Sequence, residues 1–174
     1  MKIKVLTSLL AIVAFLVVGC HTEPTPDKPD KPAPTDGVVF TANYFDCEYY
    51  GDYYTPNIGN YYIHLSDSGF TESGYARPNA TYYRLDLYSD LYDDAEGGAL
   101  RLPVGTYTLD TEDTLAHGTF SVAWSKYLRS DAEGEFSEEL SFEAGELRVT
   151  ESGAQLKVTI AGTEHTVTYE GEMV

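Results

Sequence analysis

Apolar and polar residues alternate along the chain from residue 38 onward, the pattern of strands that bury one face. Tyr61, Ile63 and Leu65 take alternate positions among polar residues, and similar stretches follow, separated by turn residues. The pattern predicts strands at residues 38–50, 61–66, 82–88, 107–109, 120–124, 136–142, 146–150, 155–160 and 164–169. No long stretch of helical periodicity lies among them, so the chain is predicted to be all-β.

The last three predicted strands give the clearest hairpins. Residues 146–150 and 155–160 flank the turn Glu151-Ser152-Gly153, and Ala161-Gly162 leads into residues 164–169. Short turns between consecutive strands favour an antiparallel meander. Eight or nine such strands bury one face each by splitting into two sheets or by closing on themselves. We therefore expect a β-sandwich or a closed, lipocalin-like barrel.

The start of the chain has the pattern of an export signal. Two lysines precede an apolar run over residues 5–18, which ends at Gly19-Cys20 and is too short for a transmembrane helix. The segment Leu16-Val-Val-Gly-Cys resembles the lipobox of bacterial lipoproteins, in which the Cys thiol accepts a diacylglycerol before cleavage. We expect residues 1–19 to be a lipoprotein signal peptide and Cys20 to be the lipidated first residue of the mature protein.

A proline-rich segment separates Cys20 from the predicted strands. Five of the eight prolines lie between His21 and Asp36, among Thr, Asp and Lys, a composition that favours extended polyproline II over a packed core. We predict that residues 20–36 are a lipidated N-terminus and tether, reaching up to about 50 Å at about 3.1 Å per residue. Residues 37–174 then form a single β-domain. A proline-rich ligand for a partner groove is the alternative, but no PxxP-plus-Arg context supports it.

Charge and cysteine content narrow the possible partners. The chain has 28 acidic and 11 basic residues and a net charge of −17, which argues against nucleic acid and against anionic lipid head groups as partners. Only two cysteines occur, and lipidation would use Cys20. Cys47 then has no intramolecular disulfide partner, and its apolar surroundings favour a small buried thiol over a nucleophile.

Tyrosine is concentrated in the first half of the predicted domain. Twelve of the fifteen tyrosines lie between Tyr44 and Tyr92. If the strands at 61–66 and 82–88 are neighbours, their polar sides share one face, the candidate ligand-binding face Tyr62, His64, Tyr82, Arg84, Asp86 and Tyr88. Such a face can stack sugar rings on tyrosine while charged groups bond hydroxyls. A solvated sheet face covered by amphipathic rings is the alternative.

Motifs for catalysis or metal binding are missing from the sequence. It contains no Gly-x-Ser-x-Gly, His-Glu-x-x-His or Gly-rich phosphate loop, so we assign no catalytic residue, metal or cofactor. Acidic loops around Asp93, Asp113 and Asp131 carry oxygen ligands but lack the spacing of a calcium loop, and we expect solvated turns. His165, in the last predicted strand, is expected at a sheet edge or at the surface.

Several features together resemble the small β-rich lipoproteins of Bacteroidota. They are the lipobox, the tether, the phrases Tyr44-Phe-Asp-Cys-Glu-Tyr-Tyr-Gly and Leu102-Pro-Val-Gly-Thr-Tyr-Thr-Leu, and the closing hairpins. The resemblance implies a cell-envelope protein held by a lipid in the outer membrane, facing either the periplasm or the outside. Some such proteins accompany glycan uptake. Asp113-Thr114-Leu115 resembles the short O-glycan acceptor of this group, which makes Thr114 a possible glycosylation site.

Three functional hypotheses follow. The first is a non-catalytic binding or scaffold domain that uses the aromatic half of the sheet, with a glycan or an envelope protein as partner. The second is a hydrolase that acts on a polymer through paired carboxylates brought together by the fold. The third is a structural envelope protein whose β-domain contacts another protein. The absence of catalytic motifs favours a protein that is not an enzyme.

Overall fold

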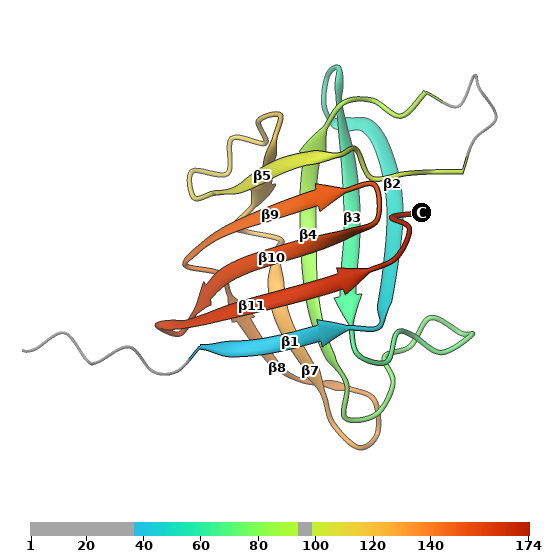
Figure 1. The fold of residues 1–174 in the computed structure, drawn as a ribbon, viewed down its shortest axis with the longest axis vertical. Helices are drawn as coiled ribbons and strands as arrows, with labels where there is room; N and C mark the ends of the chain where they lie inside the picture. The colour runs from blue at the N-terminus through green and yellow to red at the C-terminus, as the bar shows by residue number, and fades with distance from the viewer. Residues whose placement is uncertain (1–36, 94–98) are drawn as a thin grey trace, which may run out of the picture. The chain divides into compact units, whose positions relative to one another are not determined.

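The alternating residues form eleven strands that belong to one hydrogen-bonded sheet (Figure 1). The computed structural model describes residues 37–93 and 99–174, and the predicted signal peptide, Cys20 and tether lie outside them. The strands are β1 (Val38–Ala42), β2 (Tyr44–Thr55), β3 (Ile58–Ser66), β4 (Thr81–Ser89), β5 (Gly105–Asp110), β6 (Thr119–Ser121), β7 (Lys126–Ser130), β8 (Phe136–Ser141), β9 (Ala144–Thr150), β10 (Gly153–Ile160) and β11 (Thr163–Glu170). The all-β prediction is confirmed.

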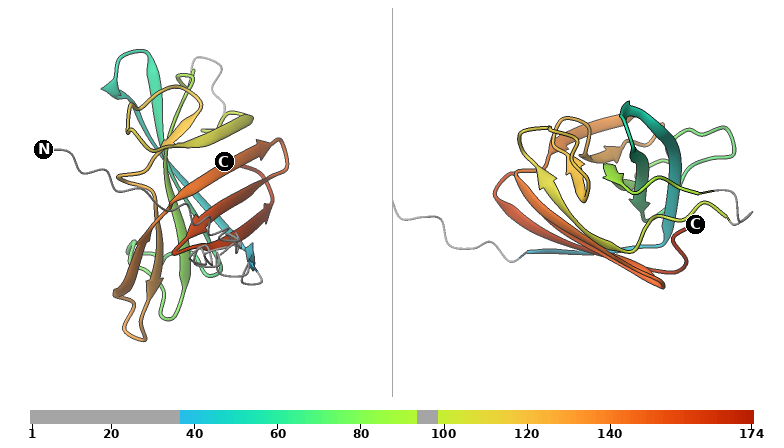
Figure 2. Two further views of the ribbon diagram at one scale, coloured as in Figure 1. Left: turned by 90° about the vertical axis from the view of Figure 1, so that its left-hand side faces the viewer. Right: turned by 90° about the horizontal axis from the view of Figure 1, so that it is seen from above.

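The sheet is mixed and open. Nine strands follow the order β1-β11-β10-β9-β5-β6-β4-β3-β2, while β7 pairs with β4 and carries β8. The pairs β1/β11 and β5/β6 are parallel, so the predicted antiparallel meander is wrong at these two places. The closed barrel is also wrong, because the sheet curls over itself without closing (Figure 2). All strands belong to a single sheet, so the sandwich alternative is not confirmed.

A corner at Asn43 divides the first predicted strand. Its backbone N–H donates to Ser66 O at 2.8 Å, and its side-chain amide donates to Asp67 O at 3.1 Å. These bonds turn the chain from β1, at one end of the strand order, into β2, at the other end. Residues 38–50 are therefore two strands and not one.

The closing hairpins are confirmed. β9, β10 and β11 are antiparallel neighbours, with Thr150 opposite Gly153 and Ile160 opposite Thr163. Ala161 and Gly162 have φ values of 47° and 75°. Positive φ at both central residues is what a tight turn of this twist requires.

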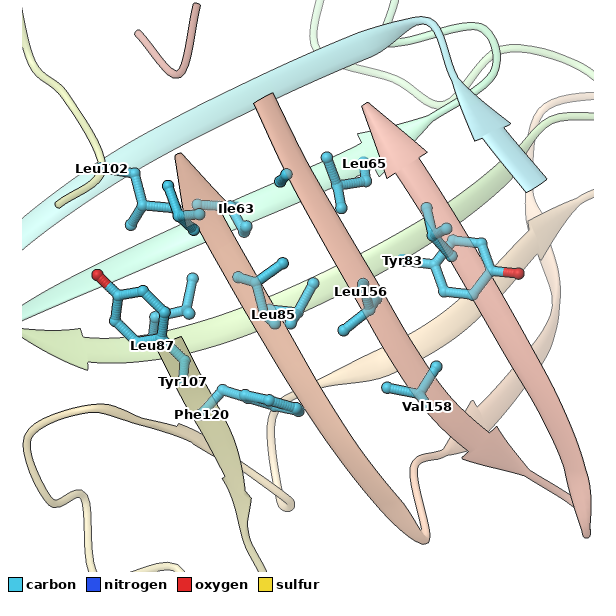
Figure 3. Close-up of a cluster of buried hydrophobic side chains, with 14 of the residues drawn as sticks. Ile63, Leu65, Tyr83, Leu85, Leu87, Leu102, Tyr107, Phe120, Leu156 and Val158 are labelled. Atoms are coloured by element: carbon cyan, nitrogen blue, oxygen red, sulfur yellow. The ribbon is translucent and has the colours of Figure 1, made fainter. Parts of the chain in front are cut away.

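The main core fills the space inside the curl. In Figure 1, β9, β10 and β11 cross in front of β2, β3 and β4. Figure 3 shows side chains of β3 and β4, such as Ile63 and Leu85, facing Leu156 and Val158 of β10, and all four are buried. The core-facing residues of β3 and β4 are odd-numbered. The even-numbered residues of these strands therefore lie on the outer face.

A buried histidine corrects one expectation. His165 is 8 % exposed, its Nδ1 lies 2.8 Å from the hydroxyl of Tyr83, and burial lowers its pKa. It is not an edge residue because β1 pairs along the other side of β11.

No helix long and apolar enough to cross a membrane occurs in the described parts of the chain.

Candidate functional site

All six residues of the candidate face lie on the outer side of β3 and β4. The two strands are antiparallel neighbours, with Tyr62 opposite Asp86 and His64 opposite Arg84. Tyr82 and Tyr88 follow on the same side because side chains two residues apart share a face. The prediction of a shared face depended on the pairing of these two strands, and they do pair.

One end of this outer face is hollowed into a pocket of about 330 Å³, at the lower end of the size range of ligand pockets. Loops that follow β5 and β6 contribute to its wall. We call it the aromatic pocket, and its described lining residues are Tyr50, Tyr54, Asn60, Tyr62, Asp86, Tyr88, Asp113, Leu115 and Trp124.

A buried polar network forms part of the pocket lining. The amide Nδ2 of Asn60 donates to Asp86 Oδ1 at 2.7 Å, and the Tyr88 hydroxyl donates to Asp86 Oδ2 at 2.9 Å. The backbone N–H of Asp86 donates to Ser125 Oγ at 3.1 Å. Burial raises the pKa of Asp86, with a contribution from Asp113, although the bonds from Asn60 and Tyr88 oppose the rise. A carboxylate held by two side-chain donors is fixed in position for a ligand.

The loop after β5 brings a second carboxylate to the pocket. Asp113 and Leu115 line it, and both have positive φ, at 54° and 57°. The carboxylate of Asp110 accepts from the backbone N–H groups of Glu112, Thr114 and Leu115. Burial by itself raises the pKa of Asp110. The three backbone hydrogen bonds and one from the Thr114 hydroxyl outweigh it, so the pKa is lowered overall. The positive φ of a bulky residue such as Leu115 is sterically unfavourable, and the Asp110 bonds offset part of that cost.

Three tyrosines form an aromatic wall. The ring of Tyr50 packs edge-on against Tyr54 and against Tyr62, with 6.4 Å between centroids in each case. The Tyr50 hydroxyl donates to Glu48 Oε2 at 2.5 Å, which raises its pKa to about 12, with smaller contributions from burial and nearby charges. A break in register at Gly51, with φ of 65°, lies between Tyr50 and Tyr54. Such a bulge changes the direction of side chains along an edge strand.

Trp124 supplies a fourth ring from a turn. It is 61 % exposed and follows β6, where the backbone N–H groups of Ala123 and Trp124 donate to Ser121 Oγ. The prediction that residues 120–124 form one strand is therefore wrong beyond Ser121. Trp124 was not predicted as a binding residue, because it has the same parity as Phe120 and so follows the pattern of a core residue.

Arg84 lies beside the pocket without lining it. Its guanidinium is 5.8 Å from the centroid of the Tyr62 ring, and its Nε donates to Trp124 O at 3.3 Å. It joins two aromatic residues of the wall by a cation–π contact and a hydrogen bond. Arg84 is thus a positioning residue for the rings.

The structure separates His64 and Tyr82 from the pocket. His64 packs edge-on against Phe70 at 4.9 Å and faces Asp46. Tyr82 is fully buried in a second, smaller hydrophobic cluster with Leu128, and its hydroxyl donates to Gly69 O at 2.6 Å. Only Tyr62, Asp86 and Tyr88 of the predicted face line the pocket.

Thr114, the possible glycosylation site, is exposed on the rim. Its hydroxyl donates to Asp110 Oδ2 at 2.7 Å, and its two neighbours in the chain, Asp113 and Leu115, line the pocket. A modification of Thr114 would therefore lie beside the entrance.

Metal ligands and the thiol of Cys47 give no second site among the described residues. Within residues 37–93 and 99–174, no three side chains of His, Cys, Asp or Glu are placed to hold a metal. Cys47 is partly buried against the main core, and burial together with Asp46 and Glu48 raises its pKa to about 12. A thiol with such a pKa is a poor nucleophile at neutral pH.

Sequence reasoning missed six lining residues, and the reasons differ. Tyr50 and Tyr54 lie on β2 around the bulge at Gly51, and Asn60 stands opposite Tyr88 on the predicted face, so its parity could have identified it. Asp113, Leu115 and Trp124 come from loops, and no local pattern tells which strands a loop covers.

No protein-family model, curated protein or solved structure matches the chain.

Proposed function

We propose that this protein is a lipid-anchored binding protein of the bacterial cell envelope, whose β-domain binds a glycan in the aromatic pocket without catalysis. The observation that carries the proposal is the composition of that pocket. Aromatic side chains line it together with two carboxylates and an amide. Flat apolar surfaces with nearby hydrogen-bonding groups suit sugar rings, which have apolar faces and hydroxyl edges.

The exposure of the rings supports binding over a purely structural role. Trp124 and Tyr54 are 61 % and 54 % exposed although both border a pocket, so they keep apolar surface available to a ligand. Asp86 is 6 % exposed and already bonded to two side chains, so it is held in place before a ligand arrives. Preorganised polar groups reduce the entropic cost of binding.

The proposed location depends on the N-terminal sequence. The Leu16-Val-Val-Gly-Cys segment supports lipidation of Cys20, and the proline-rich residues 21–36 support a spacer between membrane and domain. We place the protein in the cell envelope, anchored in the outer membrane and facing the periplasm or the outside. The membrane is one partner, contacted through the lipid anchor. The glycan is the proposed second partner, with an envelope protein as the alternative.

A hydrolase with paired carboxylates is the second candidate, and one observation favours it. Asp86 and Asp113 line the same pocket, and Asp113 contributes to the raised pKa of Asp86. Both oxygens of Asp86 already accept hydrogen bonds, which stabilises the ionised form and opposes the rise in pKa that a general acid needs. Release of reducing ends from a bound polymer, lost in Asp86→Asn and in Asp113→Asn, would establish this candidate over binding alone.

Binding measurements with matched tyrosine and tryptophan variants test the first proposal. The full-length chain is purified in a polyoxyethylene detergent, which has no sugar head group, and tested on an array of bacterial and plant glycans. For the glycans that bind, Tyr54→Ala and Trp124→Ala should weaken affinity at least about tenfold, equivalent to about 1.4 kcal/mol. Tyr75→Ala is the control, because Tyr75 is 71 % exposed and lies outside the pocket.

Two results would overturn the proposal. One is that no glycan on the array binds. The other is that Tyr54→Ala, Trp124→Ala and Tyr75→Ala bind with the affinity of the unchanged protein.

A further inference from the structure

The aromatic pocket presents mainly hydrogen-bond acceptors to a ligand. Both N–H groups of the Asn60 amide are used, since Nδ2 donates to Asp86 Oδ1 at 2.7 Å and to Leu87 O at 3.2 Å. The remaining Oδ1 of Asn60 is buried without a hydrogen-bond partner, in a residue that is 1 % exposed. A buried acceptor without a donor is costly, so a donor from a ligand at this point would be favoured.

Asp113 adds acceptor capacity. The Ser121 hydroxyl donates to its Oδ1, which leaves Oδ2 to a ligand. The charge of Asp113 contributes to the raised pKa of Asp86, whose carboxylate lines the same pocket. A positive group between them would relieve this repulsion.

Positive charge in the lining is missing. None of the described residues that line the pocket is Lys, Arg or His. The guanidinium of Arg84, outside the lining, contacts the Tyr62 ring and the Trp124 carbonyl, and its charge lowers the pKa of Asp86 by less than the charge of Asp113 raises it. Glu48, which accepts from Tyr50, adds a further negative charge beside the wall. The pocket therefore favours a cationic ligand and disfavours an acidic one.

The aromatic rings also favour a cationic ligand. Tyrosine and tryptophan faces attract ammonium groups through their quadrupoles, most strongly where water is displaced. Tyr50, Tyr54 and Trp124 border the same space as the two carboxylates. A sugar that carries an amine could place its ring on these faces and its ammonium group near Asp86 and Asp113.

We propose that the aromatic pocket selects a hexosamine with a free, positively charged amine over its N-acetylated, neutral and acidic counterparts. The ammonium group lies between Asp86 and Asp113, donates to the unpartnered Asn60 Oδ1, and is bordered by the aromatic rings. This inference rests on the proposed glycan-binding function and names the class of sugar.

The test compares four short oligomers on the full-length protein in the same sugar-free detergent. They are tetramers of glucosamine, N-acetylglucosamine, glucose and glucuronate, measured by calorimetry at a pH of about 5.5, at which the glucosamine amines are protonated. We expect the glucosamine oligomer to bind at least about tenfold more tightly than the N-acetylated one. Asp113→Asn should remove this preference, so that the two oligomers bind the variant with equal affinity.

Two controls separate the pocket from general attraction to an acidic protein. Asp90→Asn removes a carboxylate that is paired with His117 and does not line the pocket, so it should leave the preference intact. A lysine tetrapeptide matches the charge of the glucosamine oligomer without its rings and should bind at least about tenfold more weakly.

The outcomes distinguish this inference from the proposed function. Equal affinity for the amine and the N-acetyl oligomers overturns the inference and leaves glycan binding in place, as does a preference that survives Asp113→Asn. Binding of the lysine tetrapeptide equal to that of the glucosamine oligomer also overturns it. Failure of all four oligomers and of the wider glycan array overturns both.

Discussion

The hydroxyl of Ser121 donates a hydrogen bond to the carboxylate of Asp113, eight residues earlier in the chain. The same oxygen accepts from the backbone N–H groups of Ala123 and Trp124, each at 3.2 Å. One buried side chain therefore holds a carboxylate and an aromatic ring of the pocket in place. This arrangement couples the loop after β5 to the turn after β6.

Replacement of Ser121 by alanine should loosen both parts of the pocket. Asp113 loses a donor and the turn at Trp124 loses an acceptor. We expect the free energy of unfolding to fall by about 1–3 kcal/mol and the affinity for the bound glycan to fall about tenfold. Urea unfolding and calorimetry measure the two quantities.

Ser130→Ala is the matched control for Ser121→Ala. Ser130 is also buried and joins loops through its hydroxyl, which donates to Arg77 O and accepts from Ala80 N, but it does not line the pocket. It should lose similar stability and keep its affinity. If both variants bind equally well, Ser121 has no role in positioning the site.

Much of the sheet could be predicted from sequence because strand periodicity is local. The corner at Asn43 was missed, although a change of phase marks it. Core contacts come from Phe40 and Ala42 before the corner and from Phe45 and Cys47 after it, so the inward positions switch from even to odd numbers. A single strand cannot do this without a bulge or a bend.

The curl of the sheet and its two parallel strand pairs could not be predicted from strand periodicity. The pairing of β1 with β11 joins segments at opposite ends of the domain, and β5 with β6 is a parallel pair across a loop. β7 was missed altogether between Trp124 and the predicted strand at 136–142. These pairings depend on burial in three dimensions, which local alternation does not specify.

Only half of the predicted face lines the pocket. The parity of a residue tells which side of the sheet its side chain is on, but not what covers that side. Tyr62 and Asp86 were found through their alternation, and the structure sets them opposite one another. Tyr82 has the same parity, but residues around Phe70 and Leu128 cover it. Whether an outward residue meets solvent, a ligand or a covering loop is decided by tertiary packing.

Cys47 should be slow to react with thiol reagents while the protein is folded. With a pKa of about 12, its thiolate fraction at pH 8 is far below that of a free thiol of pKa about 8.5. Allowing for the greater nucleophilicity of a more basic thiolate, alkylation by iodoacetamide should be about a hundredfold slower than in urea. Peptide mapping by mass spectrometry follows Cys47 itself. Equal rates in the folded and unfolded protein would contradict this.

The proposed anchor gives a prediction for Cys20. In the bacterium that makes the protein, Cys20→Ser should abolish the incorporation of labelled palmitate and the cleavage after Gly19, because the thiol accepts the lipid. Cys47→Ser is the matched control and should be labelled and processed like the unchanged protein. If the protein with Cys20 in place is recovered without lipid and still carries residues 1–19, the lipoprotein assignment is contradicted.

Asp86 should make stability depend on pH in the direction set by its raised pKa. Burial is the main cause of the rise and brings the pKa above the unfolded value of about 3.9, so the folded protein binds more protons than the unfolded chain just above that pH. Stability from this group is therefore full below about pH 3.9 and falls as pH rises through the folded pKa.

Asp86→Asn should remove this fall in stability. Tyr88→Phe should steepen it, because it removes the hydroxyl that donates to Asp86 Oδ2 at 2.9 Å and stabilises the ionised form. Urea unfolding of the three proteins between pH 3 and 8 measures the slopes, and identical slopes would show that Asp86 titrates alike in the folded and unfolded states.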